Sequence, residues 1–449
     1  MTDDRRAKLL SRYEGRAPRY TSYPTAVQFT PTVGPSVYAN WLSALPAKDP
    51  VSVYVHVPFC TRMCWYCGCN TRVVNRHEPI GEYIELLAKE IHLVAAHLPS
   101  RLEIGSVHLG GGTPNTLSPA DLDRLFMALD QAFLVVPHMD VAAEMDPAQL
   151  QADWVRAAVG HGLNRASLGV QDLAPHVQAA VNRIEPFSMV ERAFALLREG
   201  GVHDINVDLM YGLPLQTTSD VLGTLDQVLT LAPSRIALFG YAHVPWMKAH
   251  QKLIRDADLP DPLARLDQAE AAAERLIDEG YRRIGLDHFA RPDDTLGRQA
   301  VRRNFQGYTT DPDMTLLGFG ASAIGRLPQG YVQNQSAELA WRQAIGSGRL
   351  ATARGVEISD DDRFRGEIIE RLMCDLTVDI QAVRQRHAMG PSAVADAWRG
   401  LAPFQNDGLV VVDGETLTIT ETGRPFMRAV CALFDAYLSP EAKRHSQVV

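Results

Sequence analysis

Short apolar runs alternate with stretches of helical periodicity over residues 51–241. The runs stand at 51–57, 104–109, 140–144, 164–170, 204–210 and 235–241, and their length and β-branched content predict buried strands. Between them, apolar residues recur at helical spacing, as in Ile80, Ile84, Leu87, Ile91 and Val94. Further helices are expected at 122–129, 187–199 and 216–231. Repeated strand and helix units predict an α/β protein whose parallel sheet closes into a barrel or stays open.

Polar and glycine-rich segments stand where these strands should end. They read PFC, GGGTP, EMDP, VQD, DLMYGLP and YAHVP in chain order. In parallel α/β folds the chemistry collects at the carboxyl ends of the strands. The pattern therefore predicts that one rim of the sheet carries the functional site.

The pattern changes near residue 350. Residues 346–355, GSGRLATARG, are expected to form a linker, and Ser359 followed by three aspartates predicts a helix start. The helix carries an apolar stripe of Phe364, Ile368, Leu372 and Leu376. Farther on, Asp413-Gly414 divides two β-rich runs, as in a hairpin. We expect a smaller, mostly α C-terminal domain with a winged-helix-like hairpin, acting as a lid or docking domain.

Composition limits the class of protein. The 449 residues are 46% hydrophobic and 22% charged, which is typical of a globular chain too long for one core. Apolar runs stay shorter than the ~18 residues of a spanning helix, and the N-terminus lacks the apolar segment of a signal peptide. The net charge of -9 disfavours nucleic acid as a partner. We expect a cytoplasmic monomer that binds neither nucleic acid nor membrane.

We expect three parts: an N-terminal arm (1–45), a catalytic domain (46–350) and a C-terminal domain (355–449). The arm is basic in its first 19 residues, where three acidic side chains accompany Arg5, Arg6, Lys8, Arg12, Arg16 and Arg19. This segment can serve as a solvated arm or as a substrate contact, and the residues alone do not choose between the two. Acidic residues outnumber basic ones, 14 to 10, over 360–449, which argues against DNA binding by the C-terminal domain.

Four cysteines gather directly after the first predicted strand. Cys60, Cys64 and Cys67 show the spacing CxxxCxxC, and Cys69 follows two residues later. Three thiolates on one loop suit a [4Fe-4S] cluster with one iron left open, because such clusters normally take four thiolates. The alternative is a closed site for zinc or an electron-transfer cluster, with Cys69 as the fourth ligand. The remaining cysteines, Cys374 and Cys431, lie on apolar helix faces and are expected in the core.

Two glycine-rich segments suggest ligand contacts. GGGTP, at 110–114, lets the backbone approach a ligand closely, and its N–H and C=O groups can bind the ends of an amino acid. In isolation it is more often a tight turn. GFGASAIG, at 318–325, lacks the preceding strand and downstream acidic residue of a dinucleotide site, so we reject that function for it.

Together these motifs resemble those of a known group of enzymes. CxxxCxxC after a strand, followed by GGGTP, is similar to the radical S-adenosylmethionine (SAM) superfamily, whose fold is a partial (β/α) barrel. Longer segments resemble one family within it, the oxygen-independent coproporphyrinogen III oxidases, also called coproporphyrinogen III dehydrogenases. These segments are PRYTSYPT, YVHVPFC, CGCN, VNR, DLMYGLP, DHFARPDD and NFQGYTT. The resemblance runs from Pro18 into the C-terminal domain.

The resemblance implies an enzyme of haem (porphyrin) biosynthesis, with a [4Fe-4S] cluster on Cys60, Cys64 and Cys67 and two molecules of SAM. A 5'-deoxyadenosyl radical would convert two propionates of coproporphyrinogen III to vinyl groups, giving protoporphyrinogen IX. The implied contacts of the cluster-bound SAM are Tyr54, Gly111, Glu144, Ala242 and Ile324. Those of the second SAM are Tyr66, Gly112, Thr113, Gln171, Arg183 and Asp208. An electron donor, such as a flavodoxin-like protein, and an electron acceptor are also implied, neither identified.

The resemblance also assigns less certain roles. Cys69 would be a non-ligand needed for activity, Phe305 would lie near the two SAM molecules, and Tyr54 would share in catalysis. Tyr66 departs from the family pattern, which commonly has Phe, and its hydroxyl needs a partner if buried. A related lineage of haem chaperones is the alternative function. Those proteins usually lack the second cysteine of CGC, lack the PRYTSYPT segment and carry His where this chain has Arg303, so the enzyme is favoured.

Overall fold

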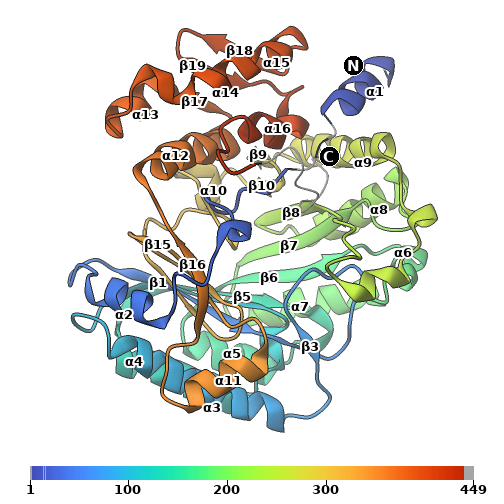
Figure 1. The fold of residues 1–449 in the computed structure, drawn as a ribbon. Coiled ribbons are helices and arrows are strands. Elements are labelled where there is room, and N and C mark those ends of the chain that lie inside the picture. Colours follow the sequence, from blue (N-terminus) through green and yellow to red (C-terminus); the bar gives the residue numbers. More distant parts are fainter. Residues whose placement is uncertain (1–2, 14, 16, 439–449) are drawn as a thin grey trace.

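The computed structural model describes residues 3–13, 15 and 17–438, and a large mixed sheet dominates it (Figure 1). The strand order is β16-β15-β14-β13-β1-β4-β5-β6-β7-β8-β10-β9. Strands β13 to β8 in this order pair in parallel. Their bounds are β1 (Val51–Val57), β4 (Glu103–Gly111), β5 (Leu134–Met145), β6 (Leu163–Gln171), β7 (Asp204–Tyr211), β8 (Arg235–Gly240) and β13 (Leu316–Phe319). Because β16 and β9 end the order without pairing to each other, the barrel is partial.

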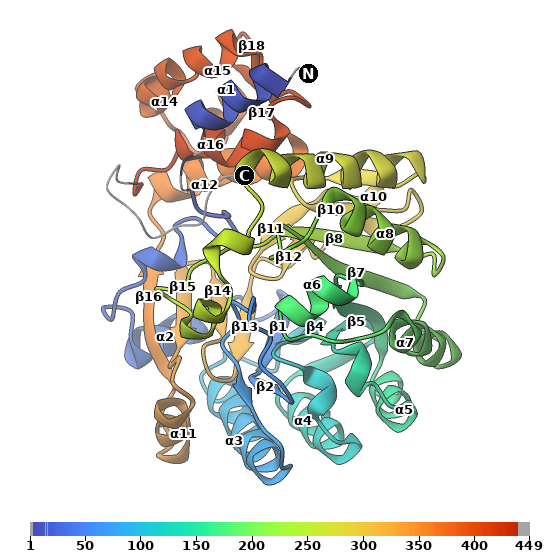
Figure 2. The same ribbon diagram turned by 90° about the vertical axis from the view of Figure 1, so that its right-hand side faces the viewer.

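Helices cover the outer side of the curved sheet (Figure 2). They are α3 (Glu78–Ala95), α4 (Pro119–Ala132), α5 (Ala152–Gly160), α7 (Phe187–Glu199), α8 (Thr218–Leu229) and α9 (Pro262–Asp278). The short helix α6 (Pro175–Ala180) lies instead at the rim, where Val177 packs with Trp65 and Tyr66 of the cysteine segment. The predicted apolar stripe of α3 is fully buried against the sheet. At the end of α7, Gly201 has φ +91°, a conformation that glycine adopts without steric cost. The predicted strands and helices of this region are thereby confirmed, with ends shifted by a few residues.

Antiparallel strands extend both edges of the sheet. They are β9 (Arg282–Ile284), β10 (His288–Ala290), β14 (Ile324–Leu327), β15 (Gly330–Asn334) and β16 (Thr352–Glu357), with α10 (Thr295–Arg298) and α11 (Glu338–Gly346) between them. Separate two-stranded sheets pair β2 (Phe59–Cys60) with β3 (Arg72–Val73) and β11 (Arg302–Asn304) with β12 (Gly307–Thr309). The prediction of a linker at 346–355 is wrong from Thr352 onward. The strand there pairs with β15 and bridges to Thr30, partners that local sequence does not reveal.

The C-terminal part stands above the sheet in Figure 1. It contains α12 (Asp360–Asp375), β17 (Thr377–Asp379), α13 (Ile380–Arg386), α14 (Ala395–Gly400), α15 (Ala402–Asn406), β18 (Val410–Asp413), β19 (Thr416–Ile419) and α16 (Met427–Ala432). The predicted hairpin joins β18 to β19, with Gly414 at φ +59°. Leu376, expected in the stripe of α12, instead lies just beyond that helix at φ +61°. Residues 439–449, part of the expected C-terminal domain, lie outside the described residues.

The N-terminal segment packs against the C-terminal part of the chain. It contains α1 (Asp3–Tyr13) and α2 (Pro35–Ser43). The hydroxyl of Tyr13 donates to Asp407 Oδ2 at 2.6 Å, and its ring lies 4.4 Å from that of Phe404. A second hydrophobic core, separate from the core beneath the sheet, combines α1 residues with those of α12 and α16. Arg16 of the basic segment lies outside the described residues. None of the helices in the described part of the chain is long and apolar enough to cross a membrane.

Replacing Leu372 by Ala should lower the free energy of unfolding by about 2–5 kcal/mol, because the side chain is fully buried in the second core. Leu376 to Ala is the matched control, since this half-buried residue lies outside the helix. It should cost less than half as much. Urea unfolding of both variants, followed by circular dichroism, measures the difference. Equal losses would contradict the packing described for α12.

Candidate active site at the strand-end rim

The cysteine loop leaves β1 and crosses the rim formed by the carboxyl ends of the parallel strands. Cys60 lies on the short strand β2, where Thr71 Oγ1 and Thr113 Oγ1 donate to its Sγ at 3.3 and 3.5 Å. Burial raises the pKa of the Cys60 thiol, and negative charge on Cys67 and Cys64 raises it further, so the three sulfur atoms lie near one another. The hydrogen bonds from the two threonine hydroxyls stabilise the thiolate and so oppose this rise in the pKa.

Cys64 and Cys67 also have hydrogen-bond donors. Arg183 Nη1 lies 3.5 Å from Cys64 Sγ, and the backbone N–H of Cys69 donates to Cys67 Sγ at 3.4 Å. A hydrogen bond with the Cys69 thiol lowers the pKa of Cys67 to about 6, although burial opposes the shift. Tyr66 hydrogen-bonds the Cys64 thiol, so the buried hydroxyl that departs from the family pattern has a partner.

This donor set fits an iron–sulfur cluster. Among the described residues, no group of three or more His, Cys, Asp or Glu side chains is arranged to hold one metal ion. Thiolates that bind different iron atoms of a cluster stand farther apart than ligands of one ion. The convergence of Cys60, Cys64 and Cys67, each with an O–H or N–H donor, suits the stabilisation of cluster thiolates.

The glycine segment after β4 has its N–H groups engaged. Gly111 N donates to Glu144 Oε2 at 3.0 Å, Gly112 N to Val57 O at 2.8 Å and Thr113 N to Phe59 O at 2.7 Å. Gly111 has φ +108°, and a side chain there would collide with the imidazole of His56. These N–H groups therefore have partners within the protein, and the role of the segment in binding SAM stays a prediction.

Glu144 lies near the end of β5 and belongs to the same site. It accepts a hydrogen bond from His108 Nε2 at 3.1 Å. Burial raises the pKa of Glu144, but the hydrogen bonds from His108 and Gly111 outweigh it and hold the pKa below its usual value. Tyr54, whose ring stacks on His108 at 5.9 Å, bonds to His56 Nδ1 at 3.1 Å. Sequence reasoning missed both histidines, although a polar side chain within a buried strand is a usable signal.

Asp208 and Glu144 both line a cavity of about 340 Å³ inside the barrel. Ser167 Oγ and Asn206 Nδ2 donate to its carboxylate at 2.9 and 2.7 Å. Burial raises the pKa of Asp208 to about 6, and the charge of Glu144 adds to the shift, while the two hydrogen bonds oppose it. The carboxyl is therefore poised to change protonation in the mildly acidic range.

The hairpin of β11 and β12 also reaches this cavity. Asn304 and Gln306 line it, on either side of Phe305. Phe305 itself packs edge-on against Tyr331, with ring centroids 6.0 Å apart, and lines a small cavity beside Ser52. In the described part of the chain, no recorded hydrogen bond or ring contact joins Phe305 to the cysteine loop. Its role near SAM stays a prediction.

The remaining expected residues lie at ends of strands. Gln171 ends β6 at φ +70°, Ala242 follows β8, and Ile324 begins β14. The side chain of Arg183 is next to two carboxylates, at 3.6 Å from Asp146 and 3.4 Å from Glu185. The positive charge of Arg183 is therefore balanced in part by Asp146 and Glu185.

A parallel partial barrel with three converging thiols at its rim is the arrangement of a radical SAM protein. The family model of the radical SAM superfamily matches residues 54–228, and the family model of the HemN C-terminal domain matches residues 358–426. The superfamily implies a [4Fe-4S] cluster and SAM as cofactors.

Relatives narrow the class. An oxygen-independent coproporphyrinogen III oxidase of Bradyrhizobium diazoefficiens is 49% identical over 99% of this chain and 100% of its own length. That of Escherichia coli is 38% identical over 97% and 96%. The solved structure of coproporphyrinogen III oxidase (HemN) from Escherichia coli, described as a radical SAM enzyme, superposes with a TM-score of 0.89 at 37% identity and covers 94% of this chain and 98% of that one. This chain belongs to the oxygen-independent coproporphyrinogen III oxidase family.

Asp208 to Asn should change how stability depends on pH. The folded pKa of about 6 lies above the usual 3.8, so the contribution of the protonated carboxyl to stability is complete below about pH 4 and lost as pH rises through 6. We therefore expect the wild-type free energy of unfolding to fall relative to that of the variant by on the order of 2 kcal/mol between pH 4 and 7. Urea unfolding at several pH values measures both curves. Parallel curves would show that Asp208 titrates normally.

Proposed function

We propose that this protein converts two propionate side chains of coproporphyrinogen III to vinyl groups without oxygen, giving protoporphyrinogen IX for haem biosynthesis. The observation that carries the proposal is the three-thiol loop at the rim of a chain similar over its full length to enzymes of that name. Each conversion removes a hydrogen atom, carbon dioxide and one electron from a propionate.

We assign the [4Fe-4S] cluster to Cys60, Cys64 and Cys67. When bound, the cluster and SAM supply a 5'-deoxyadenosyl radical, which removes hydrogen from the substrate. The protein's part is to hold the thiolates with Thr71, Thr113 and Arg183 and to position SAM. Cys69 is proposed as a non-ligand, because its thiol already hydrogen-bonds Cys67 and the residue is exposed at the rim.

Two SAM molecules are proposed, bound by different residues. Carbonyl oxygens of the glycine segment and the ionised Glu144 suit the ammonium group of the cluster-bound SAM. The other contacts proposed for it are Tyr54, Ala242 and Ile324. The second molecule would contact Tyr66, Gly112, Thr113, Gln171, Arg183 and Asp208. Cys69, Tyr54 and Phe305 are proposed to take part in the reaction.

The roles of the three parts of the chain are also proposed. Residues 1–45 and 355–449 would cover the rim of the catalytic domain (46–350), because radical chemistry needs a site closed to water. The second core, shared by α1, α12 and α16, supports such a joint cover. We propose a cytoplasmic monomer that receives electrons from a flavodoxin-like or similar donor, passes electrons to an acceptor, and binds neither membrane nor nucleic acid.

A haem chaperone is the alternative that the sequence raises. Three features oppose it: Cys69 is present, the segment PRYTSYPT is present, and Arg303 stands where those proteins usually carry His. The relatives described above are named as oxidases, which favours the enzyme over the chaperone.

The reaction itself is the first test. Protein purified and reconstituted without oxygen, then supplied with dithionite, SAM and coproporphyrinogen III, should form protoporphyrinogen IX and 5'-deoxyadenosine. Chromatography of the oxidised porphyrins and of the nucleoside measures both products. Deoxyadenosine without vinyl product would leave a radical SAM enzyme of another substrate. Stoichiometric haem binding without turnover would support the chaperone.

The ligand assignment predicts opposite results for neighbouring cysteines. Cys64 to Ser should lower iron from about four per chain to a small fraction, because a cluster held by two thiolates is not retained. Cys69 to Ser, the matched control on the same loop, should keep iron and acid-labile sulfide at the wild-type level but lose decarboxylation. Iron analysis and electron paramagnetic resonance of the reduced protein report the cluster. Loss of iron from the Cys69 variant would mean that the loop supplies four ligands.

A further inference from the structure

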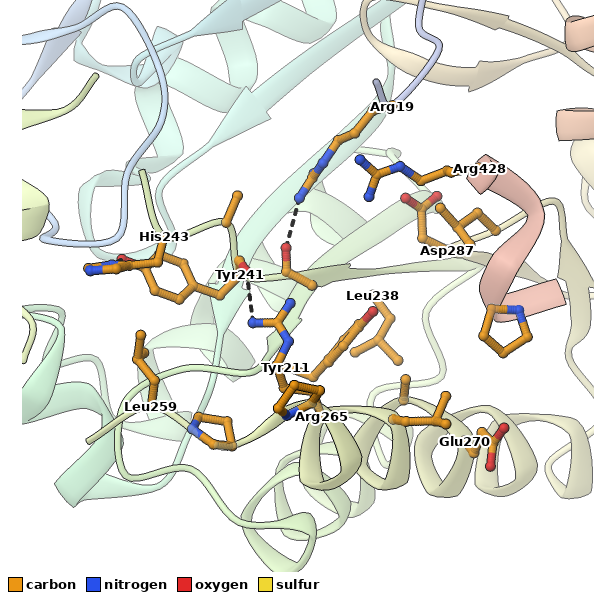
Figure 3. Close-up of a pocket in the computed structure, with 18 of the residues that line it drawn as sticks. Arg19, Tyr211, Leu238, Tyr241, His243, Leu259, Arg265, Glu270, Asp287 and Arg428 are labelled. Carbon is orange, nitrogen blue, oxygen red and sulfur yellow. Dashed lines mark hydrogen bonds between the residues drawn. The ribbon is translucent and has the colours of Figure 1, made fainter. Parts of the chain in front are cut away.

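The chain between β8 and α9, residues 241–261, crosses the rim beside the cysteine loop. Arginine side chains fix the peptide groups at its start. Arg19 Nη2 donates to Gly240 O at 2.8 Å, as Figure 3 shows. Arg265 Nη1 donates to Tyr241 O at 3.0 Å. A cavity of about 350 Å³ lies at this point, and its lining includes Arg19, Arg265, Arg283 and Arg428. The crossing segment therefore starts from a fixed position.

Two side chains in the middle of this segment reach carbonyl oxygens of the cysteine loop. Lys248 Nζ donates to Cys69 O at 2.9 Å. His250 Nε2 lies 2.7 Å from Cys67 O, and since a carbonyl oxygen only accepts, this ring nitrogen is the donor. Both bonds fall on the end of the loop that contains Cys67, the last of the three proposed cluster ligands.

Gln251, from the same segment, is 1% exposed and joins the two chains. Its Nε2 donates to Tyr66 O at 2.9 Å and to Ala242 O at 3.3 Å. Val244 N donates to its Oε1 at 2.6 Å. Ile254 of the segment belongs to the hydrophobic cluster against which Tyr66 packs. Because a buried amide is costly to leave without its hydrogen bonds, Gln251 fixes the loop relative to the end of β8.

Lys248 places a positive charge close to a proposed cluster thiolate. The Cys69 N–H donates to Cys67 Sγ at 3.4 Å, so Lys248 bonds to the residue that bonds to the ligand sulfur. In the part of the chain that the structure describes, Lys248 makes no ion pair with a carboxylate. The carboxylates of its own segment bond elsewhere: Asp256 to His243 at 3.0 Å, Asp258 to Arg255 at 2.7 Å and Asp261 to the N–H of Ala264 at 2.8 Å. Coulomb energies add, so removal of this charge changes the potential at the loop whatever other charges surround it.

We propose that Gln251 and Lys248 are positioning residues of the [4Fe-4S] cluster: Gln251 holds the loop in its cluster-binding shape, and Lys248 favours the reduced cluster. The inference rests on the cluster ligands assigned under the proposed function and does not depend on the substrate. The step concerned is the uptake of one electron, from [4Fe-4S]2+ to [4Fe-4S]+, from a low-potential one-electron donor, and no covalent bond forms or breaks. Charge and hydrogen bonds around the sulfur atoms set the potential of such clusters. Contacts that orient the ligands decide how firmly the metal is held.

The test of the charge compares K248Q with K252Q, which removes the same charge from an exposed residue of the same segment. In K248Q the equilibrium constant for one-electron reduction of the cluster should fall about tenfold, which corresponds to about 59 mV. K252Q should stay within about twofold of wild type, because an exposed charge is screened by solvent and salt. K248R, which keeps the charge, should restore the wild-type value. Redox titration of the reconstituted protein without substrate, followed by electron paramagnetic resonance, measures each potential.

The test of the loop compares Q251L with Q268L. Gln268 is also 1% exposed, and it bonds to Gly212 N and Gln216 O, away from the cysteine loop. Both variants lose the hydrogen bonds of a buried amide, so both should be less stable than wild type. Only Q251L should release iron to a chelator faster, by about tenfold. Anaerobic absorbance of the iron–chelator complex gives the rate, and thermal unfolding gives the stability.

The outcomes separate the inference from the proposed function. A wild-type potential in K248Q would overturn the inference, and so would equal rates of iron release from Q251L and Q268L. Loss of the cluster from K248Q, with retention in K248R and K252Q, would support the positioning role of Lys248. Absence of vinyl product from the wild-type protein would instead refute the proposed substrate, and both comparisons would still stand.

Discussion

The parallel pairing of neighbouring strands is the constraint on which the rest of the structure depends. Because β1 and β4 to β8 run in one direction, the segments that follow them meet at one rim. Cys64 and Arg183, which are 119 residues apart, come within 3.5 Å in this way. The helices on the outer side bury the sheet and leave the rim open to the N-terminal and C-terminal parts. A site built from loops is thereby held by a rigid scaffold.

Two neighbouring parts of the rim differ in how their hydrogen-bond donors are used. At the glycine segment the N–H groups donate to Glu144, Val57 and Phe59. Around the neighbouring cavity the directed groups are guanidinium donors. The rim therefore carries a glycine segment whose N–H groups are bonded within the protein and, beside it, a cluster of cationic side chains.

The sequence pattern predicted those features that residues close together in the chain determine. The strands and the helices of residues 51–241 follow from periodicity, and the thiols of Cys60, Cys64 and Cys67 converge because they share one loop. Features that rest on distant partners escaped prediction. β16 gains its stability from β15 and Thr30, and the arginine cavity joins side chains whose positions share no motif. The saturated N–H groups of the glycine segment also needed the fold to be recognised.

Arg428 connects the N-terminal segment to α16. Its guanidinium is buried and bonds to the carbonyl oxygens of Ala17 and Pro18, while Arg303 Nε donates to the carbonyl oxygen of Arg19 at 3.3 Å. Buried charges bound to neutral carbonyls are costly unless other charges offset them. Asp287, near Arg303 and Arg19, offsets part of this cost. The N-terminal segment is therefore held against α16 and β11 by hydrogen bonds from buried guanidinium groups to its backbone.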